Sequence, residues 1–263
     1  MTNNPFEAHG VEYLSPSSIN KFRKNPAKWL VNVAGYKDQI YKPAMSYGTA
    51  VELGLTKALF FEDTPIDDCV AESSKYLNMI RKKAKKEKHE YNIDDCKERE
   101  TRIKSTISKV LPTFKEFGVP THSQKKIELE LDFLPIPIIG YIDFLYDDSV
   151  RDLKVTKNPP KMKRDWEYQL TVYAKATNQK PFIDCIQSTK TKTEVFTFEV
   201  QNIDEHMKDI ERIANKMMRL LSLSDNIADV CYLSCIEPDL TNEDWWNEWG
   251  TNELIGAKKL FMY

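Results

Sequence analysis

The stretch that decides the fold is Gly140-Tyr-Ile-Asp-Phe-Leu-Tyr-Asp-Asp-Ser-Val-Arg-Asp-Leu-Lys154. Residues 138–146 are rich in Ile, Tyr and Phe, and residues 147–149 are polar and suit a turn. Residues 150–155 then return to types that favour a strand. The stretch therefore predicts a β-hairpin around which the rest of the chain is organised.

Charged side chains gather on this predicted hairpin. Asp152 and Lys154 are two residues apart and share a strand face, whereas Leu153 points to the other face. Asp143 lies on the partner strand and can stand across from Asp152. Converging carboxylates repel each other unless a cation lies between them, and oxygen ligands favour Mg²⁺ or Mn²⁺. Alone, an Asp-x-Lys triplet is more often a solvated strand face, so its meaning depends on the motifs elsewhere.

Other motifs accompany the hairpin in a fixed order. They are Leu-Ser-Pro-Ser-Ser-Ile at 14–19, Gly-Thr-Ala-Val-Glu at 48–52, and Gln169 with Tyr173 on a helix after the hairpin. This ordered set, from residue 14 to residue 173, resembles the PD-(D/E)xK nuclease superfamily, and within it the RecB-like or phage-type exonuclease branch. The resemblance implies an α/β fold with a restriction-endonuclease-like mixed β-sheet flanked by helices, an N-terminal helical region and a helical insertion.

The resemblance also implies roles for individual residues. The implied catalytic residues are Glu52, Asp143, Asp152, Lys154, Gln169 and Tyr173. The implied ligands of one or two Mg²⁺ or Mn²⁺ ions are Glu52, Asp143, Asp152 and the backbone carbonyl of Leu153. The implied DNA contacts are Arg23, Lys24 and Tyr173. RecB-like enzymes commonly carry Gly-x-x-x-His where this chain has Gly48-x-x-x-Glu52, and a lone Glu on a helix is otherwise a surface residue.

The N-terminal third predicts helices. Ser15 is a suitable N-cap with Pro16 at the first helical position, and Ile19 and Phe22 would face inward. An ordinary amphipathic helix accounts for this segment as well as a DNA contact through Arg23 does. Residues 45–61 predict a second helix, in which a glycine at 48 allows close packing. Residues 66–118 predict a mostly helical insertion that either grips DNA or covers one sheet face.

The remaining elements are predicted from periodicity. Residues 125–133 alternate as a half-buried strand, with one face formed by Ile127, Leu129, Leu131 and Phe133. Residues 165–178 predict a helix whose inward stripe contains Gln169, which needs a polar partner such as the carboxylate–lysine edge. Residues 183–189 and 194–200 predict strands, and residues 203–223 a long amphipathic helix. We therefore expect a single nuclease domain over 1–263: helices at 14–62, the insertion at 66–118, the catalytic sheet and helix at 125–200, and the C-terminal helix and tail at 203–263.

Composition excludes several classes of protein. A chain of 263 residues with 41% hydrophobic and 30% charged residues can bury a core of its own. No apolar run is long enough to span a membrane, and the N-terminus does not read as a secretory signal. Five cysteines at irregular spacing do not suggest a disulfide framework. We expect a cytoplasmic protein, located in the host cytoplasm if it is phage-encoded.

Charge is distributed unevenly along the chain. The formal net charge of −2 does not indicate a nucleic-acid-binding protein, but residues 81–104 carry ten Lys or Arg. They form either a phosphate-binding surface or a solvated helix with interleaved acids. Residues 220–257 have no basic residue and eight Asp or Glu, with Trp245, Trp246 and Trp249 among them. This acidic tail either packs on the body or binds a partner protein in recombination.

Cysteine placement bears on the choice of cofactor. Some RecB-like nucleases hold an iron–sulfur cluster through one Cys after the Ser-rich motif and three near the C-terminus. Here Asn25 stands where that first Cys would fall, and only Cys231 and Cys235 lie near the C-terminus. We therefore expect no iron–sulfur cluster and interpret the cysteines as buried free thiols.

The function implied by the resemblance is metal-dependent hydrolysis of DNA phosphodiester bonds. The chain has no Gly-x-x-x-x-Gly-Lys helicase motif, and so resembles a stand-alone phage-type exonuclease that acts on ends of linear duplex or on single strands in recombination or DNA processing. Two alternatives stay open. One is a catalytically inactive DNA-binding accessory in recombination or packaging, and the other is a nuclease of the same fold that cuts RNA.

Overall fold

The computed structural model describes residues 4–38, 41–61, 63–87, 91–240 and 248–261. In these ranges the helices are α1 (Pro5–Ala8), α2 (Pro16–Lys24), α3 (Pro26–Val33), α4 (Pro43–Phe60), α5 (Ile66–Lys86), α6 (Ile93–Glu100), α7 (Ile103–Glu116), α8 (Arg164–Thr177), α9 (Ile203–Leu221), α10 (Ile227–Leu233) and α11 (Thr251–Phe261). The strands are β1 (His122–Leu129), β2 (Ile138–Leu145), β3 (Ser149–Thr156), β4 (Lys180–Ser188) and β5 (Thr193–Glu199).

The five strands form one mixed sheet in the order β1-β2-β3-β4-β5. Neighbouring strands are antiparallel except β3 and β4, which are parallel. A parallel pair needs a crossover connection, and α8 supplies it. The predicted hairpin is therefore confirmed as β2 and β3, at the centre of the sheet.

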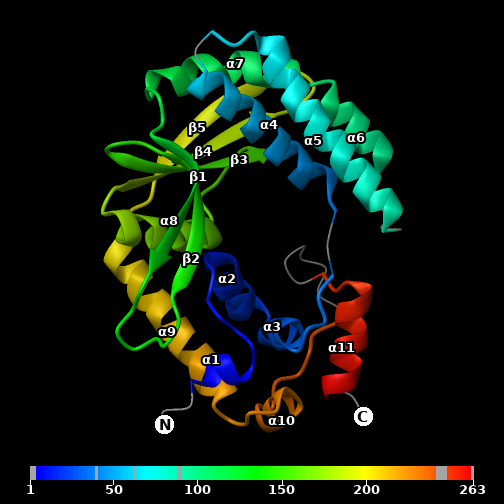
Figure 1. The fold of residues 1–263 in the computed structure, drawn as a ribbon, viewed down its shortest axis with the longest axis vertical. Coiled ribbons are helices and arrows are strands. Elements are labelled where there is room, and N and C mark those ends of the chain that lie inside the picture. Colours follow the sequence, from blue (N-terminus) through cyan, green and yellow to red (C-terminus); the bar gives the residue numbers. More distant parts are fainter. Residues whose placement is uncertain (1–3, 39–40, 62, 88–90, 241–247, 262–263) are drawn as a thin grey trace.

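Helices cover both faces of the sheet (Figure 1). On one face, α2, α8 and α9 enclose a core that includes Val150 and Ile183. On the other face, α4, α5 and α7 enclose a second core that includes Leu153 and Ile186. Successive residues of β3 therefore point into different cores, as the alternation of a strand requires. This mixed sheet between two helical layers is the predicted fold class.

The segment before α2 is attached to the edge of β2. Ser15 caps α2 through a reciprocal bond with Ser18, and Pro16 occupies the first turn. Leu14 donates its backbone N–H to Pro137 at 3.0 Å and accepts from Ile139 at 2.8 Å. The predicted cap of this helix is confirmed, and its start is fixed beside the first residues of the hairpin.

Most predicted elements are confirmed to within a few residues, but the first strand is not. The prediction placed it at 125–133, whereas β1 spans His122–Leu129. The chain turns at residues 131–134, where Leu134 donates its N–H to the carbonyl of Leu131 at 2.9 Å. Phe133 lies on this turn and is exposed, so the prediction that it joins the buried face is wrong. The alternation of apolar residues continues in the sequence to residue 133, although the chain already turns towards β2 at residues 131–134.

A buried ion pair fixes β3 to β4. Nη1 of Arg151 donates to both carboxylate oxygens of Asp184, at 3.0 and 3.1 Å. Thr197 on β5 donates its hydroxyl to the same carboxylate at 2.7 Å. The guanidinium lies between aromatic rings, 3.7 Å from the ring centroid of Phe117 and 4.6 Å from that of Phe182. The charge of Arg151 is thus neutralised by Asp184, on the face of the sheet opposite to the face that carries Asp152.

The C-terminal helix α11 is joined to α3 by a buried polar cluster. Oε2 of Glu253 lies 3.0 Å from Nζ of Lys28, and its Oε1 accepts from Nδ2 of Asn32 at 2.7 Å. The side chains of Lys28 and Glu253 are almost completely buried. The last described helix is therefore part of the same body as the N-terminal helices.

The acidic tail is described only in part. Trp249 donates its indole N–H to the carbonyl of Asp239 at 3.0 Å. Trp245 and Trp246 lie outside the described residues, so the partner-binding prediction for this tail stays a prediction. Cys235 is exposed and the other cysteines are buried free thiols. In the part of the chain that the structure describes, no helix is long and apolar enough to cross a membrane.

Candidate active site

The candidate site lies where β2 and β3 separate. Their register runs through the pairs Phe144–Arg151 and Leu145–Val150 next to the turn. Farther from the turn, the side chain of Asp143 takes the place of a backbone acceptor of β2: its Oδ2 accepts the backbone N–H of Leu153 at 2.8 Å. A strand residue points its N–H and its C=O to the same side. The carbonyl of Leu153 therefore faces the gap that Asp143 borders.

Asp152 is the most deeply buried acid of the site, with only 1% of its surface exposed. Its Oδ2 contacts the ammonium of Lys154 on the same face of β3. Its Oδ1 accepts a hydrogen bond from Nε2 of Gln169 on α8 at 2.9 Å. The half-buried Gln169 thus has the carboxylate partner that its position in the apolar stripe required.

Tyr173 extends this arrangement along α8. Its hydroxyl accepts from Nε2 of Gln169 at 2.8 Å, and its ring lies against the backbone of Gly140. Burial is the main reason that the pKa of this phenol is raised, and the negative charge of Asp152 adds to the effect. The phenol is therefore neutral at ordinary pH.

Glu52 approaches the site from α4, on the other side of the sheet edge. Its Oε1 accepts a hydrogen bond from Nε2 of Gln124 on β1, and the same nitrogen donates to Oδ1 of Asp143 at 3.0 Å. Gln124 is not among the residues that the sequence predicts for the site. A Gln on an alternating strand carries no signal of its own, because its role depends on which residue the neighbouring strand places opposite it.

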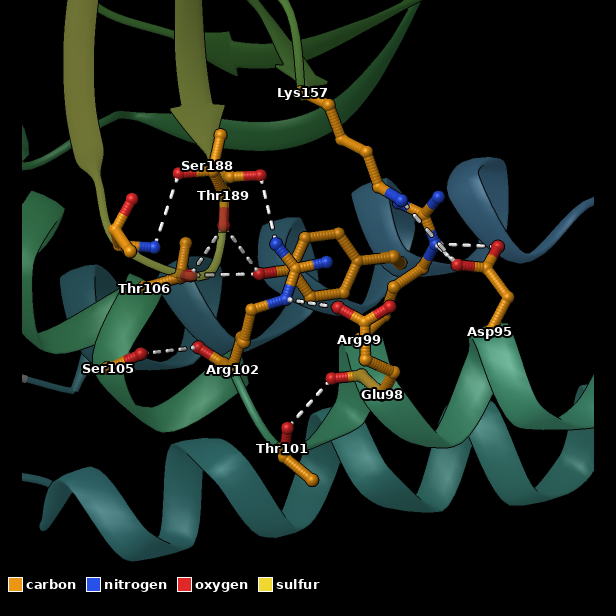
Figure 2. A network of polar contacts seen from close by, with 12 residues as sticks. Asp95, Glu98, Arg99, Thr101, Arg102, Ser105, Thr106, Lys157, Ser188 and Thr189 are labelled. Atoms are coloured by element: carbon orange, nitrogen blue, oxygen red, sulfur yellow. Dashed lines mark hydrogen bonds and ion pairs between the residues drawn. The ribbon is translucent and has the colours of Figure 1, made fainter.

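A polar network holds α4 in place (Figure 2). The hydroxyls of Tyr47 on α4 and Thr106 on α7 lie 2.8 Å apart, and each is 3.0 Å from Oγ of Ser188 at the end of β4. Arg102 donates to the carbonyl of Ser188 at 3.0 Å. Glu52 is five residues after Tyr47, and the network therefore fixes the helix that presents it.

Two glycines of α4 differ in how closely they are packed, and Gly48, which the sequence predicts to allow close packing, is the less crowded of the two. A β-carbon at Gly48 would lie 4.0 Å from Cβ of Val155 on β3, which is an ordinary contact, so α4 lies against the sheet here but does not need a glycine to do so. At Gly54 a β-carbon would be 2.4 Å from Cδ1 of Ile107 and 2.6 Å from Oγ of Ser73. The contact on α4 that requires a glycine is therefore the one that Gly54 makes with α5 and α7.

The acids of the site perturb one another. Burial raises the pKa of Asp143 well above its usual range, and the charges of Asp152 and Glu52 raise it further. Burial is also the main reason that the pKa of Glu52 is raised, while the hydrogen bond from Gln124 opposes this. Burial alone would lower the pKa of Lys154, but Asp152 and Asp143 outweigh it and raise the pKa. One ammonium therefore faces three carboxyl groups, a surplus of acids that suits a cation.

The donor atoms fit a hard divalent cation, because the carboxylates and the Leu153 carbonyl supply only oxygen. Their present arrangement is not a ready coordination sphere. Within the described ranges, no group of three or more His, Cys, Asp or Glu side chains is placed to hold a metal ion. Instead, the amide of Gln124 stands between Glu52 and Asp143, and the ammonium of Lys154 contacts Asp152.

The predicted DNA contacts on α2 lie in ion pairs at the start of α8. Nη2 of Arg23 is 2.7 Å from Oδ1 of Asp165, and Nζ of Lys24 is 2.6 Å from Oδ2. Asn20 donates to the backbone carbonyl of Asp165 at 3.0 Å. These contacts join α2 to the helix that carries Gln169, and a role of the two basic residues in DNA binding stays a prediction.

Comparison with known proteins agrees with this geometry. The family model described as "PD-(D/E)XK nuclease superfamily" matches residues 13–230, most of the chain, and the chain therefore belongs to this superfamily. The mixed sheet flanked by helices is accordingly the restriction-endonuclease-like fold that was predicted. No curated protein matches the chain.

Solved structures resemble the fold at low sequence identity. A protein named "Putative exonuclease" from Eubacterium rectale superposes with a TM-score of 0.52 and 15% identity, over 82% of this chain and 87% of that one. At this identity the likeness concerns the fold alone. The structure of SSO0001 aligns with a TM-score of 0.34 and 13% identity, over 81% of this chain and 94% of that one.

Proposed function

We propose that this chain is a metal-dependent DNA exonuclease of the RecB-like or phage-type branch, which hydrolyses phosphodiester bonds at DNA ends in recombination or DNA processing. The observation that carries the proposal is the meeting of Asp152 and Lys154 on β3 with Asp143 on β2 and Glu52 on α4. The name of the E. rectale protein supports the choice of an exonuclease within the superfamily.

In this proposal Glu52, Asp143, Asp152 and the carbonyl of Leu153 hold one or two Mg²⁺ or Mn²⁺ ions. A divalent ion so held supplies a Lewis acid for the phosphate and lowers the pKa of a bound water. The N–H of Leu153 orients Asp143, and the amide of Gln169 orients Asp152, so that both carboxylates are held before a cation arrives.

Lys154 has a different task, because an ammonium donates hydrogen bonds and is not a metal ligand. Its raised pKa keeps the proton on Nζ, so that it can donate to the attacking water or to a phosphate oxygen on which negative charge develops. Gln169 and Tyr173 act as positioning residues on α8, and the exposed part of this edge receives the DNA strand, with Arg23 and Lys24 as candidate phosphate contacts.

The test uses one purified sample with three substrates. We expect end-labelled linear DNA to be degraded with Mg²⁺ or Mn²⁺, circular DNA to resist, RNA to stay intact, and EDTA to stop the reaction. An Asp152→Ala sample purified in the same way controls for contaminating nucleases.

Each other outcome selects a different function. Cleavage of the circle would replace the exonuclease by an endonuclease, and cleavage of RNA alone would change the substrate. DNA binding without cleavage of any substrate would contradict the proposal and favour the inactive accessory protein.

A further inference from the structure

Gln124 has an unusual backbone for its place in the fold. Its φ is +50°, in the left-handed region that residues other than Gly, Asn and Asp rarely adopt. The other non-glycine residues of positive φ in the described ranges are Asn178, Asn202 and Cys235. Asn178 and Asn202 flank helices, and Cys235 follows one, whereas Gln124 lies inside β1. Strained backbone of this kind persists only where the surroundings hold it.

The register of β1 and β2 explains where the side chain points. Ser123 pairs with Phe144 and Lys125 pairs with Ile142, so Gln124 stands directly across from Asp143. Its single nitrogen Nε2 donates to Asp143 on β2 and to Glu52 on α4. An amide has two N–H donors, and here each is directed to a different acid of the site.

This position is the one that a cation shared by the two acids would take. The amide nitrogen presents partial positive charge to one oxygen of each carboxyl group, which is also what a bridging Mg²⁺ or Mn²⁺ would do. The two cannot occupy the gap together. In the described part of the chain the amide, and not a cation, joins these two acids.

We infer that Gln124 is a placeholder: its amide keeps Glu52 and Asp143 together without metal and must leave when a divalent cation binds, so it sets the metal affinity of the site. This inference rests on the proposed function, because it concerns the cation assigned to that site. Gln124 is a positioning residue in this scheme, and the left-handed backbone is what directs its side chain into the gap.

The test is calorimetric titration of the metal-free protein with Mn²⁺. We expect Gln124→Gly to bind Mn²⁺ about tenfold more tightly, since binding no longer breaks hydrogen bonds to two acids, which together are worth about a factor of ten. Glycine accepts the positive φ without strain, so the backbone is retained. Gln124→Asn should behave like the glycine variant, because it tolerates this backbone but is one methylene too short to reach both acids.

Ser123→Gly is the matched control, since it places a glycine on the same strand beside the site and removes no contact to Glu52 or Asp143; its Mn²⁺ affinity should equal that of the wild type. Circular dichroism confirms that each variant is folded. Suppose that the wild type binds Mn²⁺ and that Asp152→Ala abolishes this binding. If both Gln124 variants then bind Mn²⁺ no more tightly than the wild type, the placeholder role is overturned and the proposed function is left intact. A wild type that binds no Mn²⁺ at all overturns both.

Discussion

Gly140 lies against the ring of Tyr173 so closely that a β-carbon on Gly140 would be 2.5 Å from Cε1 of the tyrosine. The first residue of the hairpin stretch is therefore a glycine because α8 has to approach β2 there. The contact sets the distance between the helix that carries Gln169 and the strand that carries Asp143.

Gly140→Ala should destabilise the protein by about 1–3 kcal/mol, because the buried ring of Tyr173 has to move. The displaced helix should also loosen the Gln169–Asp152 hydrogen bond and reduce cleavage. Urea unfolding and a nuclease assay measure the two effects. Gly48→Ala is the control: its β-carbon has room, and it should be neutral or stabilise α4 by up to about 1 kcal/mol. Equal stability of the two variants would contradict the packing argument.

Asp152→Ala should lose both Mn²⁺ binding and cleavage, the latter by about 1,000-fold or more, because metal assistance is worth several kcal/mol. Lys154→Ala should lose about 100-fold or more in rate yet still bind Mn²⁺. Single-turnover cleavage and Mn²⁺ titration separate the two roles. Lys157→Ala, which changes an exposed lysine directly after the end of β3, should behave as wild type. Loss of Mn²⁺ binding in Lys154→Ala would make this lysine a structural residue.

Glu52 differs from the histidine that is common at its position in RecB-like enzymes. If it is a metal ligand, Glu52→Gln should weaken both Mn²⁺ binding and cleavage. Glu52→His should retain part of both, and more with Mn²⁺ than with Mg²⁺, because imidazole can bind Mn²⁺ whereas Mg²⁺ prefers oxygen. Rates of both variants with each metal decide the matter. Wild-type rates in Glu52→Gln would leave the site with two carboxylates.

The raised pKa of Asp143 predicts a pH dependence of stability without metal. In the unfolded chain this carboxyl group has a pKa of about 4 and loses its proton above that pH. In the folded state its pKa is higher, so the group still holds the proton at a pH where the unfolded chain has lost it. The free energy of unfolding should therefore fall as the pH rises from about 4 to the folded pKa, and then level off. Urea unfolding in EDTA measures this, and Asp143→Asn, which cannot ionise, should show a smaller fall. An identical pH profile for the variant would show that Asp143 ionises normally.

The sequence identified the hairpin and the acids because their signals are local. Asp152 and Lys154 share a face by strand alternation alone, and Ser15 with Pro16 marks a helix start wherever it lies. Gln124 could not be found in this way, since its partners come from β2 and α4. The crowded position of Gly54 could not be predicted for a similar reason, because side chains of α5 and α7 create the crowding.

The Arg151–Asp184 pair has a consequence for how the sheet assembles. A shift of β3 by one residue would turn Arg151 towards α8 and bring Asp152 between the rings of Phe117 and Phe182. Both charges would then be buried without their counterparts, which is far more costly than the loss of an apolar contact. Misaligned forms of the sheet are thereby excluded during folding, and a chain that has closed its sheet correctly has, in the same event, aligned its acids.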